Sequence, residues 1–484
     1  MAQSDQLIST PGPTPGKIEA PVSQAVSEGE HSLNNQLAIK KWLPFITLEA
    51  SFATVFVVFT GGAFLTGLAL MLGANDFEIG LLAAIPFLAQ VAQLFSAYLT
   101  DRTGKRKAIA VWSIFVSRQI CWILLAVFLL PSSWRLQVLI GVVILSNFTT
   151  MIAAPGWLAW MAELVPEKIR GRYFGSRSAA VAIATVSATL IGGVIIDRFR
   201  LLNREDLGFG LIIGLACLFA LVAWVLMKKL PDRPAESLRL SFDFNHLVEP
   251  LKNPSYAKLL GVFFVWNMAI GISAAFFVPH MLNNLKMNFT MISLYSSAAA
   301  LIAVILNKPW GILIDRFGSR PVLVFCAFGI AVVPLIWLFP RQDFLWILAF
   351  ESIYSGGLWT GFNLAAFNIP IANSPREGRT MYLAMFAVIT GLGFFLASIA
   401  GGIIAQLLSS VHWHIGPQTI VNYHILFAIS GIVRLLAALL VMTFHEPTEK
   451  GLPIMVQFMG YAVLKWLSVG RQIHPWYRRV ASGR

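Results

Sequence analysis

The chain has 484 residues, of which 57% are hydrophobic and only 12% are charged. Because soluble domains carry about 25% charged residues, this composition excludes an ordinary soluble protein. The net charge of +13 would suit a nucleic-acid-binding protein, but the basic residues lie in short segments between long apolar runs. That distribution is typical of membrane topology, and no nucleic-acid partner is expected.

The first segment, residues 1–41, is rich in Ser, Pro, Gln and Gly and has no apolar core. We predict a disordered cytoplasmic tail for it. It lacks the basic start and apolar stretch of a signal peptide, so none is expected here.

Apolar runs fill most of the chain from Trp42 to Phe444, and a helix needs about 20 apolar residues to cross a bilayer. Backbone groups in lipid must be hydrogen-bonded within the segment, so we interpret the runs as transmembrane helices. Twelve spans are predicted, with approximate ranges 42–72, 77–99, 108–130, 136–163, 176–197, 207–227, 256–281, 291–313, 322–340, 343–371, 381–408 and 421–444.

The longest connection between predicted spans is 229–255, which contains four prolines among charged residues. Proline-rich polar stretches mark loops, so we predict a cytoplasmic linker there. It divides the chain into a first six-helix bundle at 42–228 and a second at 256–445.

A loop motif occurs once in each predicted bundle, after its second span. The copies read Asp101-Arg102-Thr103-Gly104-Lys105-Arg106 and Asp315-Arg316-Phe317-Gly318-Ser319-Arg320. Arg170-Gly171-Arg172 and Glu377-Gly378-Arg379 repeat later in the same order. The aspartates are 315 − 101 = 214 residues apart and the later glycines 378 − 171 = 207 apart, which indicates a duplicated membrane unit.

Six spans, a polar loop, six more spans and this motif in both halves resemble the major facilitator superfamily over about Trp42 to Phe444. The family's pattern places a glycine four residues before the aspartate. Gly311 matches it in the second copy, whereas Ala97 replaces it in the first. The resemblance implies an all-α polytopic fold of two six-helix bundles that rock about a central site, with alternating access.

Each motif aspartate ends a predicted helix, where the helix dipole disfavours an anion, so each needs a donor from elsewhere. The resemblance implies that the first aspartate docks on the eleventh helix. We predict two crossed gating contacts, Asp101 with Arg379 and Asp315 with Arg172. The alternative is that these charges only set topology. The predicted gating set is Asp101, Arg102, Gly104, Arg106, Asp315, Arg316, Gly318, Arg320, Arg172 and Arg379.

The basic residues predict the orientation of the chain. With both termini in the cytoplasm, 27 of the 36 Lys and Arg residues fall on the cytoplasmic side, 6 on the other side and 3 within spans. This asymmetry follows the positive-inside rule and predicts a multi-pass protein of the cytoplasmic membrane, the inner or plasma membrane. Residues 446–484 are predicted to form a cytoplasmic tail with an interfacial amphipathic helix at 452–469, rather than a thirteenth span.

Charged residues inside spans are costly and need an explanation. Glu49 in the first span and Glu351 in the tenth are the proton-coupling candidates. A structural ion pair is the alternative for each, with Arg434 as the expected partner of Glu351. Arg118 in the third span is expected to pair internally, and Asp197 is expected to lie at the membrane interface.

Polar and aromatic residues on the family's cavity-lining helices are the candidates for solute contact. Aromatic faces with sparse amides suit sugars or amphipathic organic molecules. The predicted substrate-binding residues are Asn267, Tyr354, Asn363 and Trp266.

The sequence therefore predicts a secondary active transporter of a small organic solute, with protons as a candidate coupling ion. The alternatives are a transporter of lipid-like amphiphiles and a non-transporting assembly or sensor protein on the same fold. Three cysteines in apolar runs, the absence of a metal-ligand spacing and the absence of a Walker loop predict no cofactor, no metal and no enzymatic activity. Membrane lipids are expected partners, and the resemblance implies a monomer.

Overall fold

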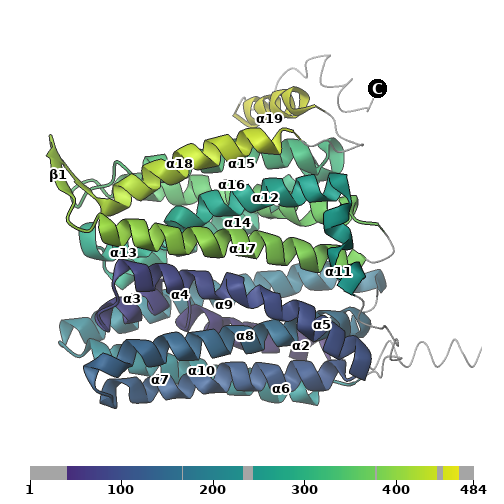
Figure 1. The fold of residues 1–484 in the computed structure, drawn as a ribbon, viewed down its shortest axis with the longest axis horizontal. Helices are drawn as coiled ribbons and strands as arrows, with labels where there is room; N and C mark the ends of the chain where they lie inside the picture. The colour runs from purple at the N-terminus through teal and green to yellow at the C-terminus, as the bar shows by residue number, and fades with distance from the viewer. Residues whose placement is uncertain (1–40, 166, 233–243, 376–378, 444–450, 468–484) are drawn as a thin grey trace, which may run out of the picture.

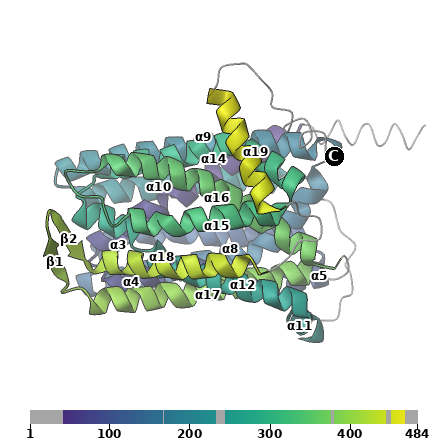
Figure 2. The ribbon, with the colours of Figure 1, turned by 90° about the horizontal axis from the view of Figure 1, so that it is seen from above.

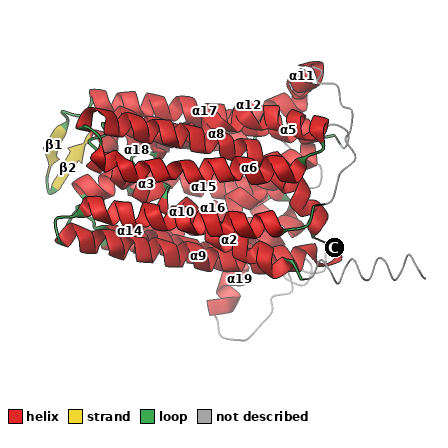
Figure 3. Cartoon of the chain, turned by 90° about the horizontal axis from the view of Figure 1, so that it is seen from below, coloured by secondary structure: helices red, strands yellow, loops and turns green. Residues whose placement is uncertain are grey.

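The computed structural model describes residues 41–165, 167–232, 244–375, 379–443 and 451–467. Long, roughly parallel helices dominate it, with one small β-hairpin at one end (Figure 3). The helices of the first half and those of the second half lie side by side as two groups (Figure 1). The disordered tail predicted for 1–41 falls almost wholly outside the described residues.

Six helical segments make up the first half, and three of them are interrupted. Their bounds are α2 Leu43–Phe59 with α3 Gly62–Met71, α4 Asp76–Leu88 with η1 Ala89–Val91 and α5 Ala92–Thr103, α6 Arg106–Gln119 with η2 Ile120–Trp122, α7 Ile123–Ala126 and η3 Val127–Leu129, α8 Ser132–Leu164, α9 Glu167–Leu201, and α10 Glu205–Lys229.

The second half repeats this order after a short helix in the predicted linker. Its elements are α11 Phe244–Lys252, α12 Pro254–Ala274 with α13 Phe277–Pro279 and the π-helical turn η4 His280–Asn284, α14 Phe289–Phe317, α15 Ser319–Ile336, α16 Trp346–Asn373, α17 Arg379–Leu407, the strands β1 His412–Ile415 and β2 Gln418–Val421, and α18 Asn422–Val441. The strands pair antiparallel, with His412 opposite Val421.

Eleven helical segments of the described chain are long and apolar enough to cross a membrane. The remaining predicted span, the tenth at 343–371, corresponds to α16, which is not among the eleven although it has 28 residues. Glu351 and several asparagines lower its hydropathy. It nevertheless packs along α14 and α15 and exposes Ile353 and Phe367 at its surface, as a lipid-facing helix does. The structure is therefore consistent with twelve spans.

The C-terminal helix α19, Leu452–Leu467, runs obliquely to the other helices (Figure 2). Within the described residues it has 16 residues, fewer than the roughly 20 that a span requires, and its oblique course also favours the predicted interfacial placement. Met455 is fully buried, and the Phe458 ring centroid lies 5.4 Å from that of Phe317. The helix thus packs against the motif loop of the second half.

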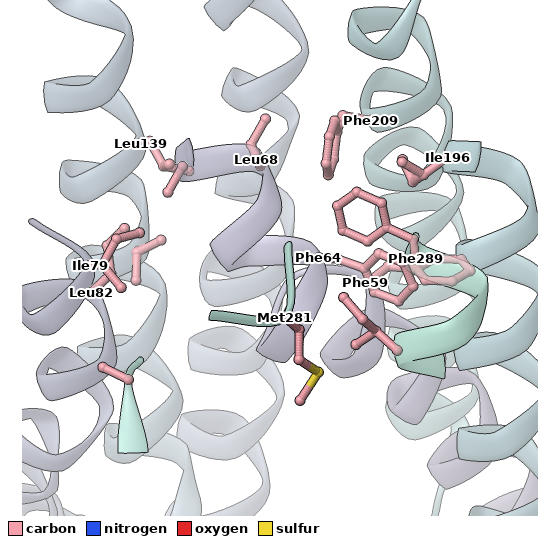
Figure 4. Packing of buried hydrophobic residues seen from close by; sticks show 14 of the residues in the cluster. Phe59, Phe64, Leu68, Ile79, Leu82, Leu139, Ile196, Phe209, Met281 and Phe289 are labelled. Carbon is pink, nitrogen blue, oxygen red and sulfur yellow. The ribbon is translucent and has the colours of Figure 1, made fainter. Parts of the chain in front are cut away.

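Apolar side chains from both halves form one core near the hairpin. Phe59, Phe64 and Phe209 of the first half meet Met281 and Phe289 of the second half there (Figure 4). A separate cluster fills the second half around Trp266 and Phe362. We call the end with the β-hairpin the hairpin end and the end with residues 101–106 and 315–320 the motif end.

Candidate functional site

The glycines of the two motif copies end helices in backbone conformations that favour glycine. Gly104 follows α5 with φ +64°, and Gly318 follows α14 with φ +95°. A Cβ atom makes positive φ costly, so glycine is the favoured residue at both positions. This local geometry explains why the glycine occurs in both copies.

Basic residues next to the motif glycines bind the last helix of their own half. Lys107 Nζ donates a hydrogen bond to the Leu230 carbonyl at 2.7 Å, just after α10. Arg320 Nη2 donates to the Met442 carbonyl at 2.5 Å, just after α18. Cations are favoured at helix C-termini, so part of the basic cluster stabilises each half from within.

The predicted gating contacts at the motif end stay predictions. The side chains of Asp101 and Arg172 lie outside what the structure describes, as do Glu377 and Gly378. Asp315 is exposed, and Arg379 is half-buried with no hydrogen-bond partner for its Nε among the described residues. The Arg316 guanidinium lies 4.4 Å from the Phe458 ring centroid of α19. Arg102 is exposed, whereas Arg106 is half-buried.

At the hairpin end, an aspartate of the first half binds the start of a helix in the second half. Asp197, near the end of α9, accepts hydrogen bonds from the backbone amides of Phe289 at 2.9 Å and Thr290 at 2.7 Å. These amides begin α14, where free N–H groups and the helix dipole favour an anion. The expected interfacial placement of Asp197 missed this contact between halves.

An equivalent contact joins the corresponding helices with the halves exchanged, from α17 of the second half to α4 of the first. Gln406, near the end of α17, accepts a hydrogen bond from the backbone amide of Asp76 at 3.1 Å, at the start of α4. Asp76 in turn accepts hydrogen bonds from Asn422 Nδ2 at 2.8 Å and the Tyr423 hydroxyl at 2.6 Å in α18. Hydrogen bonds around Asp197 and around Asp76 thus join the two halves at the hairpin end.

The repeat of the two segments that make these contacts is visible in the sequence. Residues 192–197 read Gly-Gly-Val-Ile-Ile-Asp and residues 401–406 read Gly-Gly-Ile-Ile-Ala-Gln, so Gln406 lies 406 − 197 = 209 residues after Asp197. That offset agrees with the 207 and 214 of the other repeated features. We call Asp197 with the start of α14, and Gln406 with the start of α4, the paired latches.

Glycines beside the paired latches let the two halves approach closely. A Cβ on Gly193 would lie 2.8 Å from the Phe289 carbonyl oxygen and would also collide with the Ser293 hydroxyl. A Cβ on Gly402 would lie 3.1 Å from the Asp76 carbonyl oxygen. Only glycine fits the contact of Gly193 with α14 without displacing backbone.

Gly193→Ala is expected to lower the thermal unfolding midpoint by several degrees. Alanine ordinarily stabilises a helix relative to glycine, but the clash with α14 should cost about 1–3 kcal/mol and reverse the sign. Gly210→Ala is the matched control, because no heavy atom lies within 4 Å of that Cβ position. Equal midpoints for both variants, measured in detergent, would contradict close packing of α9 on α14.

A cavity of about 470 Å³ lies within the first half, between α2, α6, α8 and α9. Glu49 on α2 and Arg118 on α6 line it, with Glu49 Oε1 and Arg118 Nη1 3.7 Å apart. Glu49 is 4% exposed, so this ion pair is buried. Arg177 on α9 lines the same cavity, with its guanidinium 5.4 Å from the Trp157 ring centroid. The internal pairing predicted for Arg118 is present, and its partner is the coupling candidate of the first span.

A second cavity, of about 550 Å³, extends toward the hairpin end. Val57 and Thr150 line both cavities, so the two adjoin. Phenylalanines form much of the wall of the larger one, where helices of the second half also contribute Ala275 and Phe394. It is therefore mainly apolar and partly shared between the halves.

The first helix of each half is interrupted at the larger cavity. Gly61 is extended and Gly62 has φ +49° between α2 and α3, and both line this cavity. In the second half α12 ends at Ala274, which also lines it together with Ala275. Non-helical backbone inside a membrane is tolerated where it lines a cavity or is buried in protein. The predicted single spans 42–72 and 256–281 did not anticipate these breaks.

The four predicted substrate residues lie apart from these two cavities. Asn267 donates to the Phe263 carbonyl of its own helix, and Tyr354 donates to the Gly329 carbonyl. Trp266 is buried and stacks on the Phe362 ring at 4.8 Å, and Asn363 is exposed. None of the four lines either cavity.

Glu351 has a different partner from the one predicted. The Tyr295 hydroxyl donates a 2.6 Å hydrogen bond to Glu351 Oε2. Arg434 Nη2 instead donates to the Ser273 hydroxyl at 3.1 Å, so the expected pair of Glu351 with Arg434 is wrong. Both residues are almost fully buried, and Glu351 lines neither cavity. Side-chain direction around the helix axis decided this outcome.

Comparisons with known proteins agree with this architecture. The sequence model described as "Major Facilitator Superfamily" matches residues 50–279 and 259–476. The chain belongs to the major facilitator superfamily. This multi-pass membrane protein is 22% identical over 342 residues to an uncharacterized MFS-type transporter of Methanocaldococcus jannaschii, covering 70% of this chain and 84% of that protein. It is 29% identical over 224 residues to the minor myo-inositol transporter IolF of Bacillus subtilis, covering 43% and 48% of the two chains.

Solved structures of other superfamily members share the fold. A D-xylose-proton symporter superposes with a TM-score of 0.62 at 15% identity, over 84% of this chain and 97% of the symporter. The nucleoside transporter NupG superposes with a TM-score of 0.58 at 15% identity, over 84% and 98% of the two chains. At these identities the likeness establishes the fold, and the site must be argued from this chain's own residues.

Proposed function

We propose that this superfamily member is a secondary active transporter that moves a small organic solute by alternating access. The observation that supports it best is the pair of adjoining cavities. They contain a buried ion pair and extend toward the hairpin end, where the two halves are joined. A buried charge in a membrane protein is costly and marks a functional site by default. Transporters among the relatives, including those of inositol and xylose, support the same class.

The paired latches supply one of the two gates that alternating access requires. They join the first half to the second at the hairpin end. Asp101 with Arg379 and Asp315 with Arg172 would join the halves at the motif end after the hairpin end opens. Each conformation then exchanges one set of contacts between halves for the other, which keeps the two states close in free energy.

We place the motif end in the cytoplasm and the protein in the cytoplasmic membrane. The excess of basic residues on that side supports this orientation. The structure would then represent the inward-facing state, closed on the outside.

Glu49 is the better candidate for proton coupling. It lines a cavity beside Arg118, whereas Glu351 is bonded to Tyr295 away from both cavities. A coupling carboxyl has to meet both solute and water during the cycle, which the position of Glu49 supports.

Counterflow in proteoliposomes tests the transport proposal. Purified protein is reconstituted, loaded with one member of a panel of sugars, nucleosides, organic acids and amines, and assayed for uptake of the labelled compound. We expect saturable exchange for one chemical class. A folded protein that exchanges no compound of the panel, and gains no thermal stability from any, would favour the non-transporting alternative.

Asp101→Asn is expected to slow counterflow and to populate the state that is open at the motif end. Loss of one charge-assisted contact should shift the equilibrium by about 1.5–3 kcal/mol, or roughly tenfold or more. Asp343→Asn is the matched control, since its 74% exposed side chain pairs with Arg341 on the same loop. Unchanged exchange and unchanged conformational balance in Asp101→Asn would reject the gating role.

A transporter of amphiphilic molecules is the second candidate. The larger cavity favours it, because Phe56, Phe59, Phe64, Phe209 and Phe394 make its wall suited to an apolar body. Counterflow with an amphiphile but with no sugar or nucleoside would select this candidate.

A further inference from the structure

We propose that the smaller cavity binds the carboxylate of an organic anion whose apolar body extends into the larger cavity. This inference rests on the proposed transport function and names the chemical class of its substrate. It is carried by the charges, the unused donors and the walls of the two cavities.

The charge balance of the smaller cavity calls for an anion. Two guanidinium groups, Arg118 and Arg177, line it with a single carboxylate, Glu49. Guanidinium groups keep their charge in proteins, and the remaining lining side chains are apolar or carry hydroxyl groups. Among the described residues that line the cavity, one positive charge is therefore left without a carboxylate, and the carboxylate of a ligand would compensate it.

The two guanidinium groups retain donors for a ligand. Arg118 Nη1 and Arg177 Nε are buried without a hydrogen-bond partner among the described residues. The 3.7 Å between Arg118 Nη1 and Glu49 Oε1 exceeds the roughly 2.7–2.9 Å of a charge-assisted hydrogen bond. Arg177 is oriented by its contact with the Trp157 ring. A carboxylate between these groups would satisfy donors that the protein leaves unused.

The adjoining cavity determines the rest of the ligand. Both cavities meet at Val57 and Thr150, on helices α2 and α8. Beyond that junction the wall carries Phe56 and Phe64 and has few polar groups. A molecule whose carboxylate lies at the arginines can place an aromatic or aliphatic body there. A small hydrophilic anion such as acetate would leave this wall uncovered.

Calorimetric titration of the full chain in nanodiscs tests the inference. The probes are phenylbutyrate, phenylbutanol and phenylbutylamine, which share one body and differ in the head group. We expect phenylbutyrate to bind at least about tenfold more tightly than the alcohol, since charge-assisted bidentate contacts are the stronger ones. The amine should bind more weakly still.

Variants separate the arginine site from partition into lipid. Arg177→Gln should lower the affinity for phenylbutyrate about tenfold and leave that for phenylbutanol unchanged. Glu49→Gln should raise the affinity for phenylbutyrate, because it removes the competing carboxylate. Arg204→Gln is the matched control, as that 59% exposed arginine pairs with Asp206 away from both cavities.

Three results would overturn the inference. They are equal affinity for the three probes, absence of phenylbutyrate binding to folded protein, and an equal loss for acid and alcohol in Arg177→Gln. Counterflow of a neutral or cationic solute alongside any of them would keep the transport proposal and reject the anion. Loss of all counterflow would instead reject the transport proposal.

Discussion

Asp197→Ala is expected to shift the protein toward the conformation that is open at the hairpin end. The alanine removes a carboxylate that accepts hydrogen bonds from the Phe289 and Thr290 amides, and it leaves the start of α14 without its anion. Hydrogen bonds to charged groups contribute about 1.5–3 kcal/mol, and Asp197 is partly exposed, so we expect about 2 kcal/mol. That corresponds to roughly a 30-fold change in the ratio of the two states.

Distances between spin labels at Leu202 and Trp413 measure this shift. Both side chains are exposed at the hairpin end, one in each half, and the native cysteines are buried. The distance distribution should lengthen in Asp197→Ala and lengthen less in Asp197→Asn, which keeps one acceptor oxygen. Asp343→Ala is the control, because that residue contacts its own loop. An unchanged distribution in Asp197→Ala would mean that the latch does not hold the halves together.

The paired latches should differ in strength. Gln406 is a neutral acceptor that makes one 3.1 Å hydrogen bond to the Asp76 amide, whereas Asp197 makes two charge-assisted bonds. Neutral hydrogen bonds contribute about 1 kcal/mol net. Gln406→Ala should therefore lengthen the label distance less than Asp197→Ala. The opposite order would indicate that the contacts of Asp76 with α18 carry most of the closure.

Glu49→Gln is expected to cause the second large effect. It leaves two guanidinium charges in the smaller cavity with no carboxylate among its lining residues. Removing one partner of a buried ion pair costs about 3 kcal/mol or more, because the other charge stays buried without compensation. The thermal unfolding midpoint should fall, and counterflow should be lost.

The double variant Glu49→Gln with Arg118→Met distinguishes a structural pair from a functional one. Replacing both charges leaves Arg177 as the single surplus charge, as in the parent protein, so the unfolding midpoint should recover to near that of the parent. A functional pair predicts recovered stability without recovered counterflow. Recovery of both would show that the pair only stabilises the fold.

Several charged residues of the candidate site could be predicted from residue type and position in the sequence. The predictions that failed depended on which face of a helix meets its neighbour. Glu49 and Arg118 were recognisable because charged side chains within apolar runs are rare and costly. Glu351 was recognised for the same reason, but its partner Tyr295 depended on which face of α16 meets α14. Asn363 shows the same limit, since it is exposed and lines neither cavity, whereas the family resemblance implied that its helix lines the central cavity.

The sequence by itself determined the fold class. The length of the apolar runs and the repeat of the loop motif can both be read along the chain without knowledge of tertiary contacts. It also contained both copies of the latch segment at 192–197 and 401–406, although each reads as an ordinary helix end in isolation. Tertiary structure alone decided that Asp197 and Gln406 each reach the opposite half, and that the helix breaks at Gly61 and Ala275 face one cavity. These features depend on how helices far apart in the sequence rotate and dock against each other. The apolar periodicity of a single helical segment does not indicate which distant helix it docks against.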